Sequence, residues 1–299
     1  RARRQFLAMD RDAQIRALTG PDAKDIIRKA ALTHEVIAGS IGTIPADVWE
    51  TLVPEMGYMA LRMNLRRIEA SGASRSLVAT INERLSDVEE AAKSRTMPVA
   101  FYSAYKNAPL AFAAALQDAA NASLENVPAL KGSTLVLLDR SGSMSGILST
   151  KSSLTCQDTA NVFAAALALR GENVRVVAFD GFMEDVNVSG TDLLRVVDQM
   201  PAPRGGTYTP EVIRWAHKDG HQYDRIVILT DEQYWGGSVD KALDTYAPGV
   251  PVFTWNLAGY RTAQMEACEG RWTFGGLSDK GFQMIPLLER GIGQSWPWE

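Results

Sequence analysis

After residue 131 the sequence alternates between short apolar runs and stretches with helical spacing, a pattern that few folds accommodate. The four apolar runs are Thr134–Leu138, Val174–Phe179, Arg225–Leu229 and Val252–Leu257. The helical stretches between them are about Thr155–Arg170, Pro210–Asp219 and Ser238–Tyr246. Nearly continuous apolar strands separated by helices indicate a parallel sheet that is covered on both faces. We therefore predict one doubly wound α/β domain over residues 131–299.

Residues 1–130 follow a different pattern, in which alanine, leucine and methionine recur at helical spacing without strand-like alternation. Short breaks at Pro21, Pro45 and Pro98 divide this region into separate helices. Several helices with short connections indicate stacked pairs, as in HEAT-like repeats. The expected fold class is therefore α/β plus all-α, with a helical-repeat domain over residues 1–130 before the sheet.

The expected helix from about Pro54 to Ala70 is the most informative one in this region. Its predicted apolar face consists of Met56, Met59, Ala60 and Met63. Arg62 and Arg66 lie four residues apart on another face, and no acidic residue stands three or four positions from Arg62. An arginine in that setting is either an ordinary solvated side chain or a site for an external anion.

Composition excludes several classes of protein. The net charge is −4, and residues 1–130 carry 16 lysines and arginines against 15 aspartates and glutamates. This balance excludes a uniformly basic nucleic-acid binder but allows a local basic face. Cys156 and Cys268 show no CxxC spacing, which argues against a disulfide scaffold and a thiolate zinc site. No long apolar run or export signal is visible, so we expect a cytoplasmic protein, and the missing initiator methionine suggests a fragment or a processed product.

Oxygen-bearing side chains follow the predicted strands at three separate places. They are Asp139, Ser141, Ser143, Thr207 and Asp231. Ligands of such sheets bind outside the carboxyl ends of the strands, where these loops should meet. An all-oxygen set suits a hard cation such as Mg²⁺, or another divalent cation. Because only two of these side chains are carboxylates, we expect the ion to attract an acidic group from a protein partner. The alternative is that the cluster serves only turns and helix caps.

The order Asp139-x-Ser141-x-Ser143, followed by a distant threonine and a distant aspartate, resembles the metal-ion-dependent adhesion site (MIDAS) of von Willebrand factor A domains. The resemblance implies that fold and its magnesium site over residues 131–299. Enzyme motifs fit less well, because Met144 occupies the nucleophile position of a GxSxG-like stretch and Gly205-Gly206 is too short for a phosphate loop. No general base is evident either, so we expect no enzyme.

The segment Val48–Leu65 resembles the helix signature of the TROVE module, which occurs in the Ro autoantigen family. The stretches Arg95–Lys106 and Trp296–Trp298 fit the same resemblance. It implies helical repeats that close into a ring, single-stranded RNA ends in a basic central hole, and small noncoding, Y-RNA-like RNA on the outer face. Met63 departs from the family by occupying the position of an arginine. The family's helical module is also longer, so we expect that earlier repeats are missing from this chain or that the protein is a shortened relative.

The resemblance suggests a set of RNA-binding residues. They are Arg62, Asn64, Arg66, Arg67, Arg95 and Lys106. Arginine would meet phosphate, Asn64 would hold backbone or base, and three tyrosines would stack on bases. These tyrosines are Tyr58, Tyr102 and Tyr105. The leading hypothesis is a non-enzymatic, Ro-like ribonucleoprotein component that binds small noncoding or misfolded RNA and carries a Mg²⁺ adhesion site. The alternative is a metal-dependent protein–protein adhesion module whose helices serve only as scaffold.

Overall fold

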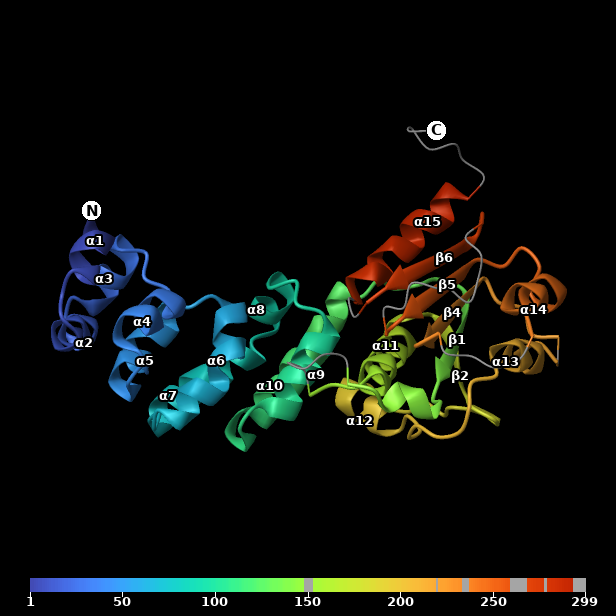
Figure 1. The fold of residues 1–299 in the computed structure, drawn as a ribbon, viewed down its shortest axis with the longest axis horizontal. Helices are drawn as coiled ribbons and strands as arrows, with labels where there is room; N and C mark the ends of the chain where they lie inside the picture. Colours follow the sequence, from blue (N-terminus) through green and yellow to red (C-terminus); the bar gives the residue numbers. More distant parts are fainter. Residues whose placement is uncertain (148–152, 219, 233–236, 259–267, 277–278, 293–299) are drawn as a thin grey trace. The chain divides into compact units, whose positions relative to one another are not determined.

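The computed structural model describes residues 1–147, 153–218, 220–232, 237–258, 268–276 and 279–292, which fall into two compact units (Figure 1). The first unit comprises Arg1–Thr96 and Ala104–Ala122, and the second comprises Met97–Ser103 and Ser123–Glu299. The break at Ala122 lies close to the predicted boundary at residue 130. No helix in these described ranges is long and apolar enough to cross a membrane.

The first unit is helical, as the sequence predicts. Its helices, of which α9 begins in the second unit, are α1 (Ala2–Leu7), α2 (Arg11–Thr19), α3 (Ala23–Lys29), α4 (His34–Ile41), α5 (Ala46–Leu52), α6 (Tyr58–Ala70), α7 (Arg75–Ser86), α8 (Val88–Lys93), α9 (Pro98–Asn107) and α10 (Ala113–Ser123). Short polar side chains begin several of them by accepting a backbone N–H, namely Asp10, Thr33, Ser74 and Asp87. Sequence neighbours pack together, with α2 against α3 and α6 against α7.

The buried face of α6 differs from the predicted one. Met59 and Met63 are 56% and 70% exposed, so the methionine face is wrong. The face that packs inward consists of Tyr58, Leu61, Leu65 and Ile68. This second stripe carries large apolar side chains along the whole helix, whereas the methionine stripe runs into Arg66 after Met63. The longer stripe buries more apolar surface, at roughly 1.5–3 kcal/mol per large side chain. Of the predicted methionines, Met56 is buried just before the helix, whereas Met59 and Met63 face solvent.

The second unit contains the predicted doubly wound sheet. Its strands are β1 (Ser133–Asp139), β2 (Asn173–Phe179), β3 (Met183–Asp185), β4 (Arg225–Thr230), β5 (Val252–Asn256) and β6 (Arg271–Gly275). They lie in the order β3-β2-β1-β4-β5-β6, and only the β2–β3 pair is antiparallel. The sequence did not predict the two edge strands, because β3 has only three residues and both are largely outside the core.

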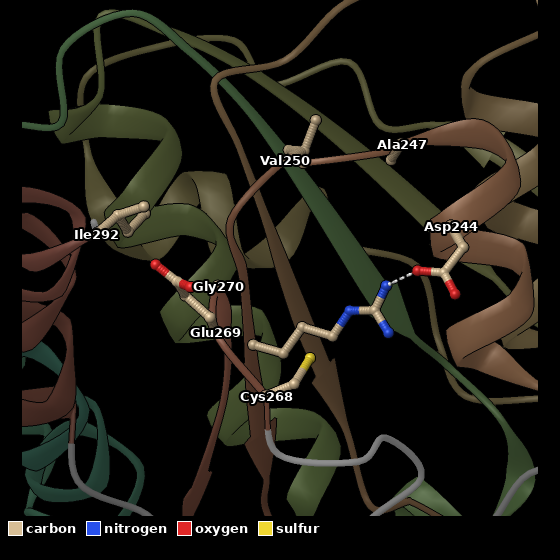
Figure 2. A pocket seen from close by; sticks show the side chains of 9 residues that line it. Asp244, Ala247, Val250, Cys268, Glu269, Gly270 and Ile292 are labelled. Atoms are coloured by element: carbon tan, nitrogen blue, oxygen red, sulfur yellow. Dashed lines mark hydrogen bonds and ion pairs between the residues drawn. The ribbon is translucent and has the colours of Figure 1, made fainter.

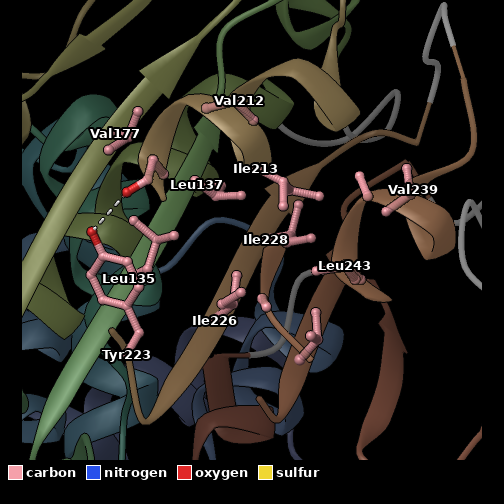
Figure 3. Packing of buried hydrophobic residues seen from close by; sticks show 14 of the residues in the cluster. Leu135, Leu137, Val177, Val212, Ile213, Tyr223, Ile226, Ile228, Val239 and Leu243 are labelled. Atoms are coloured by element: carbon pink, nitrogen blue, oxygen red, sulfur yellow. Dashed lines mark hydrogen bonds between the residues drawn. The ribbon is translucent and has the colours of Figure 1, made fainter. Parts of the chain in front are cut away.

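Helices cover both faces of this sheet. The helices after β1 are α11 (Cys156–Arg170), α12 (Leu193–Asp198), α13 (Thr209–Ala216), α14 (Val239–Tyr246) and α15 (Ile285–Gly291). Figure 3 shows α13 and α14 packed on one face through Val212, Ile213 and Leu243. Side chains of a strand alternate between faces, so Val136 and Leu138 point to the opposite side, where α11 lies.

Two predicted helix starts can be compared with the structure. The capping box at α11 is confirmed, since the side chain of Thr155 accepts from Asp158 N and the side chain of Asp158 accepts from Thr155 N. Helix α13 begins one residue earlier than expected: its N-cap is Tyr208 rather than Thr209, and that cap makes no side-chain hydrogen bond.

Candidate metal centre and nucleic-acid interface

Asp139 is the last residue of β1 and is completely buried at the carboxyl edge of the sheet. Its Oδ1 accepts a hydrogen bond from the backbone N–H of Ser141 at 2.8 Å, and its Oδ2 accepts one from the hydroxyl of Thr230 at 2.6 Å. Neighbours on both sides therefore fix the orientation of the carboxylate.

The electrostatic state of Asp139 follows from this burial. Removal from water raises its pKa from 3.8 to about 7, while the hydrogen bonds from Thr230 and Ser141 lower it. The negative charge of Asp231 contributes to this rise. Without a cation at this edge, ionised Asp139 is thus costly, and a positive charge nearby would stabilise it.

The serines of the same loop lie next to Asp139. Ser141 is buried and Ser143 is half-buried, and their hydroxyl oxygens are 3.1 Å apart. The 3-10 helix Gly142–Ser145 turns this loop, with Met144 buried beneath it. Adjacent ligands in a magnesium octahedron, with bonds of about 2.1 Å, lie about 3.0 Å apart. The hydroxyl spacing matches that requirement.

The loop that carries Thr207 contacts the Asp139 loop through its backbone. The N–H of Gly142 donates to the carbonyl of Gly205 at 3.0 Å, and the N–H of Arg204 donates to the carbonyl of Arg140 at 2.6 Å. Thr207 stands two residues beyond Gly205 and is 1% exposed. The structure thus brings two loops that are distant in sequence to one place.

Asp231 belongs to a third segment of the chain, at the end of β4. It directly follows β4, is 1% exposed, and its charge raises the pKa of both Asp139 and the Cys156 thiol. Asp139, Ser141, Ser143 and Asp231 therefore lie at the carboxyl edge formed by β1 and β4, and Thr207 stands two residues beyond Gly205, which contacts the same loop. Hydroxyls and carboxylates are the donors that a hard cation prefers, so the residues fit Mg²⁺. Within the described ranges there is no group of three or more histidines, cysteines or acidic residues that could hold a metal ion.

The predicted RNA-binding residues of α6 fall into two groups. Arg66 and Arg67 are exposed, and Arg62 is half-buried, with a pKa that burial lowers. Asn64 differs, because it is 2% exposed and its amide donates to the carbonyl of Ala60 at 2.8 Å. The side chain of Asn64 thus bonds within its own helix, where its oxygen also accepts from Nη1 of the exposed Arg67 at 3.4 Å, so its burial does not match the expected direct contact with RNA.

The remaining residues predicted to contact RNA also differ in their exposure. Arg95 is exposed just after α8, with a left-handed backbone (φ 51°), and Lys106 is exposed in the last turn of α9. Tyr58 is 8% exposed and donates its hydroxyl to the carbonyl of Leu85 at 2.8 Å. The expectation that Tyr58 stacks on a base is therefore wrong. Tyr105 is 38% exposed, and the half-buried Tyr102 donates to Asp158. The stretch Trp296–Trp298 lies outside the described residues.

Comparison with known families agrees with both halves of this description. The model of the TROVE domain matches residues 43–161, and the model of the Ro60 von Willebrand factor A domain matches residues 133–252. The chain belongs to the Ro family. No curated protein matches it.

A solved structure gives the fold relationship within the Ro family. The crystal structure of the Ro (RSR) protein of Deinococcus radiodurans matches with a TM-score of 0.72 and 20% sequence identity. The match covers 90% of this chain and 59% of that one. The present chain thus spans well under two thirds of that Ro protein, and at this identity the match establishes the fold.

Several residues around the metal-site loops of this Ro-family chain were not predicted from its sequence. Thr230 anchors Asp139, and Asp180 binds the side chains of Arg140 and Arg204. Asp180 carried a usable signal, since it directly follows an apolar run of the sequence, just as Asp139 does. Thr230 and the arginines carried none, because their partners are distant in sequence.

A separate cavity of about 470 Å³ lies at the opposite edge of the sheet, before β5 and β6 (Figure 2). Cys268 and Arg271 line it, and Arg271 pairs with both Asp240 and Asp244. The one arginine in the lining is therefore neutralised by the domain's own carboxylates, which does not favour an anionic ligand.

Proposed function

We propose that this chain is an RNA-binding protein of the Ro type, which binds small noncoding RNA and single-stranded RNA ends without catalysing a reaction. The observation that carries the proposal is the exposed side of α6, inside the matched TROVE region. There, Arg66 and Arg67 project from a regular helix whose opposite side is anchored in the core.

The chemistry of this side suits a nucleic-acid strand. Guanidinium groups form paired hydrogen bonds with phosphate oxygens, and their charge displaces counterions from the RNA backbone. Met59 and Met63 share the exposed side of α6 with these arginines and offer apolar surface to sugars or bases. Arg95 and Lys106 are further exposed cations of the same unit.

The test is the affinity for a fluorescently labelled, unstructured single-stranded RNA, measured by anisotropy over a series of salt concentrations. In the double variant Arg66→Gln/Arg67→Gln we expect affinity to fall at least about fivefold and the salt slope to fall by about 1.4, or 0.7 per lost phosphate contact. The matched control is Arg214→Gln/Lys241→Gln, which removes two exposed charges from α13 and α14. An equal loss of RNA affinity in both double variants, or no loss of affinity in Arg66→Gln/Arg67→Gln, would contradict a specific role for α6 in RNA binding.

A second candidate function concerns the sheet edge. We infer that Asp139, Ser141, Ser143, Thr207 and Asp231 hold Mg²⁺ and that the ion attracts a carboxylate from a protein partner. The donor set supports this inference, because it combines only two carboxylates with neutral hydroxyls. A bound ion would therefore keep a strong affinity for another anion. Exposed apolar side chains of adjacent loops, Ile147 at 69% and Phe182 at 73%, offer further contact area.

Binding of MgCl₂ followed by calorimetry tests the site directly, with Asp139→Ala as the variant that should abolish it. Partner capture in Mg²⁺ and in EDTA, each with and without nuclease, separates the two functions. Metal-dependent capture that survives nuclease supports adhesion, whereas capture that nuclease removes supports an RNA bridge.

The placement of the histidines favours binding over hydrolysis. His217 bonds through Nδ1 to the carbonyl of Ile213 and lies edge-on to Tyr223, and His221 also lies beside Tyr223. Tyr223 precedes β4, so both imidazoles lie at the amino end of that strand, away from Ser141. A serine at the carboxyl edge therefore has no imidazole base from these two residues.

A further inference from the structure

We propose that Asp180 is a positioning residue for the metal site: it joins the loop of Asp139 to the loop of Thr207 through two arginines. This inference rests on the proposed magnesium site, and it concerns residues that are not metal ligands themselves.

The first connection runs through Arg140, which stands between the predicted ligands Asp139 and Ser141. Arg140 is only 2% exposed, an unusual burial for a charged side chain. Its Nε lies 3.1 Å from Oδ2 of Asp180, and its Nη1 pairs with Glu184. Burial of the guanidinium is thus balanced by two carboxylates from the β2–β3 hairpin.

The second connection runs from the same carboxylate to the other loop. Oδ2 of Asp180 accepts from Nε of Arg204 at 2.9 Å, while Oδ1 accepts from the N–H of Phe182 at 2.6 Å. Arg204 leads directly into Gly205, Gly206 and Thr207. One buried carboxylate therefore cross-links the backbone segments on either side of the metal site.

Close backbone packing supports the same assignment. Gly205 has a φ of 68°, and a Cβ built there would lie 3.2 Å from Cβ of Asp180. The loop can approach Asp180 this closely only with glycine at this position. The backbone hydrogen bonds between Arg140 and Arg204 and between Gly142 and Gly205 add to the cross-link.

Electrostatics gives Asp180 a second effect on the site. Without the carboxylate of Asp180, only Glu184 would still pair with the buried Arg140, whose charge lies next to the predicted ligands Asp139 and Ser141 in the chain. That charge would repel a divalent cation, and the Thr207 loop would lose its side-chain anchor. Both effects act in the same direction, toward weaker metal binding.

The experiment is calorimetric titration of the full chain with MgCl₂ alone. We expect Asp180→Asn to weaken Mg²⁺ binding by about 10–100-fold, the usual consequence of losing a residue that orients metal ligands. The matched control is Glu289→Gln, which removes the partner of another buried arginine, Arg225, at the amino edge of the same sheet. It should lower the melting temperature comparably and leave Mg²⁺ affinity within about twofold.

A milder variant protects the test against a folding defect. Arg204→Gln alters a side chain that is 59% exposed and leaves the Arg140–Asp180 pair in place, so we expect a smaller loss of Mg²⁺ affinity in a folded protein. Unchanged Mg²⁺ affinity in folded Asp180→Asn and in Arg204→Gln would overturn the positioning role. An equal loss in Glu289→Gln would also overturn it, since the effect would then follow stability. If the unmodified chain binds no Mg²⁺, the metal site itself fails, and the inference fails with it.

Discussion

We predict that Asp139 destabilises the folded chain at neutral pH when no metal ion is bound. Its pKa is raised from 3.8 to about 7 by burial, so in the absence of a cation its ionisation at neutral pH opposes folding. A rise of roughly three pH units corresponds to about 4 kcal/mol. The variant Asp139→Asn resembles the protonated acid in size and cannot ionise. In EDTA at pH 8 we therefore expect it to be more stable than the unmodified chain, by up to about 4 kcal/mol.

The sign of the pH dependence follows from proton counting. Between about pH 4 and pH 7 the folded state keeps the proton on Asp139 and the unfolded state has lost it, so the stability of the unmodified chain falls as pH rises through this window. Above pH 7 both states are ionised and the contribution becomes constant. The stability difference between the variant and the unmodified chain should thus be near zero at pH 4, grow up to pH 7 and then stay level.

The assay is urea unfolding of both proteins in EDTA at a series of pH values, repeated with MgCl₂. Subtracting one protein from the other removes the titration of all other groups. Added Mg²⁺ should stabilise the unmodified chain above pH 7 and leave the variant unchanged, because a ligand that binds only the folded state stabilises it. If the stability difference between the two proteins in EDTA does not vary with pH, the raised pKa of Asp139 is refuted. If Mg²⁺ stabilises both proteins equally, the role of Asp139 as a metal ligand is refuted.

Three further predictions concern other parts of the chain. Met63→Arg places a cation at a 70% exposed position, so RNA affinity should rise a few-fold and the salt slope of binding should rise by about 0.7. The free energy of unfolding should stay within about 0.5 kcal/mol of that of the unmodified chain. A decrease in RNA affinity would argue against RNA binding on this side of α6. Asn64→Ala removes a buried amide that bonds to the carbonyl of Ala60 and accepts from Arg67, so the free energy of unfolding should fall by about 1–3 kcal/mol in chemical unfolding, and RNA affinity should fall less than in Arg66→Gln/Arg67→Gln because both arginines remain. Thr155→Ala breaks the capping box of α11 and should lower stability by about 1 kcal/mol, whereas Thr245→Ala, an exposed helical threonine, serves as the control.

Local sequence was sufficient for most of the architecture. The apolar runs of β1, β2, β4 and β5 identified central strands, because a strand buried on both faces needs apolar side chains at nearly every position. The order of Asp139, Ser141 and Ser143 identified a hydroxyl-rich loop, since residues so close in sequence share one turn. The edge strands β3 and β6 lacked such a signal, as they are short and partly solvated.

Tertiary structure decided which of several locally acceptable surfaces became buried. Helix α6 carries two apolar stripes, and periodicity alone cannot rank them; the packing of Leu61, Leu65 and Ile68 inside the unit left Met59 and Met63 outside. The same packing turned Asn64 and Tyr58 inward, which removed two predicted RNA contacts.

The sequence did not predict side-chain interactions between segments that are distant along the chain. Asp180 meets Arg140 and Arg204, and Thr230 meets Asp139, only because the parallel strands carry their ends to one edge. Composition and spacing determined which residue types were available, since periodicity is a property of neighbouring residues. Which charges balance each other in the interior depends on three-dimensional proximity, and only the folded chain establishes that.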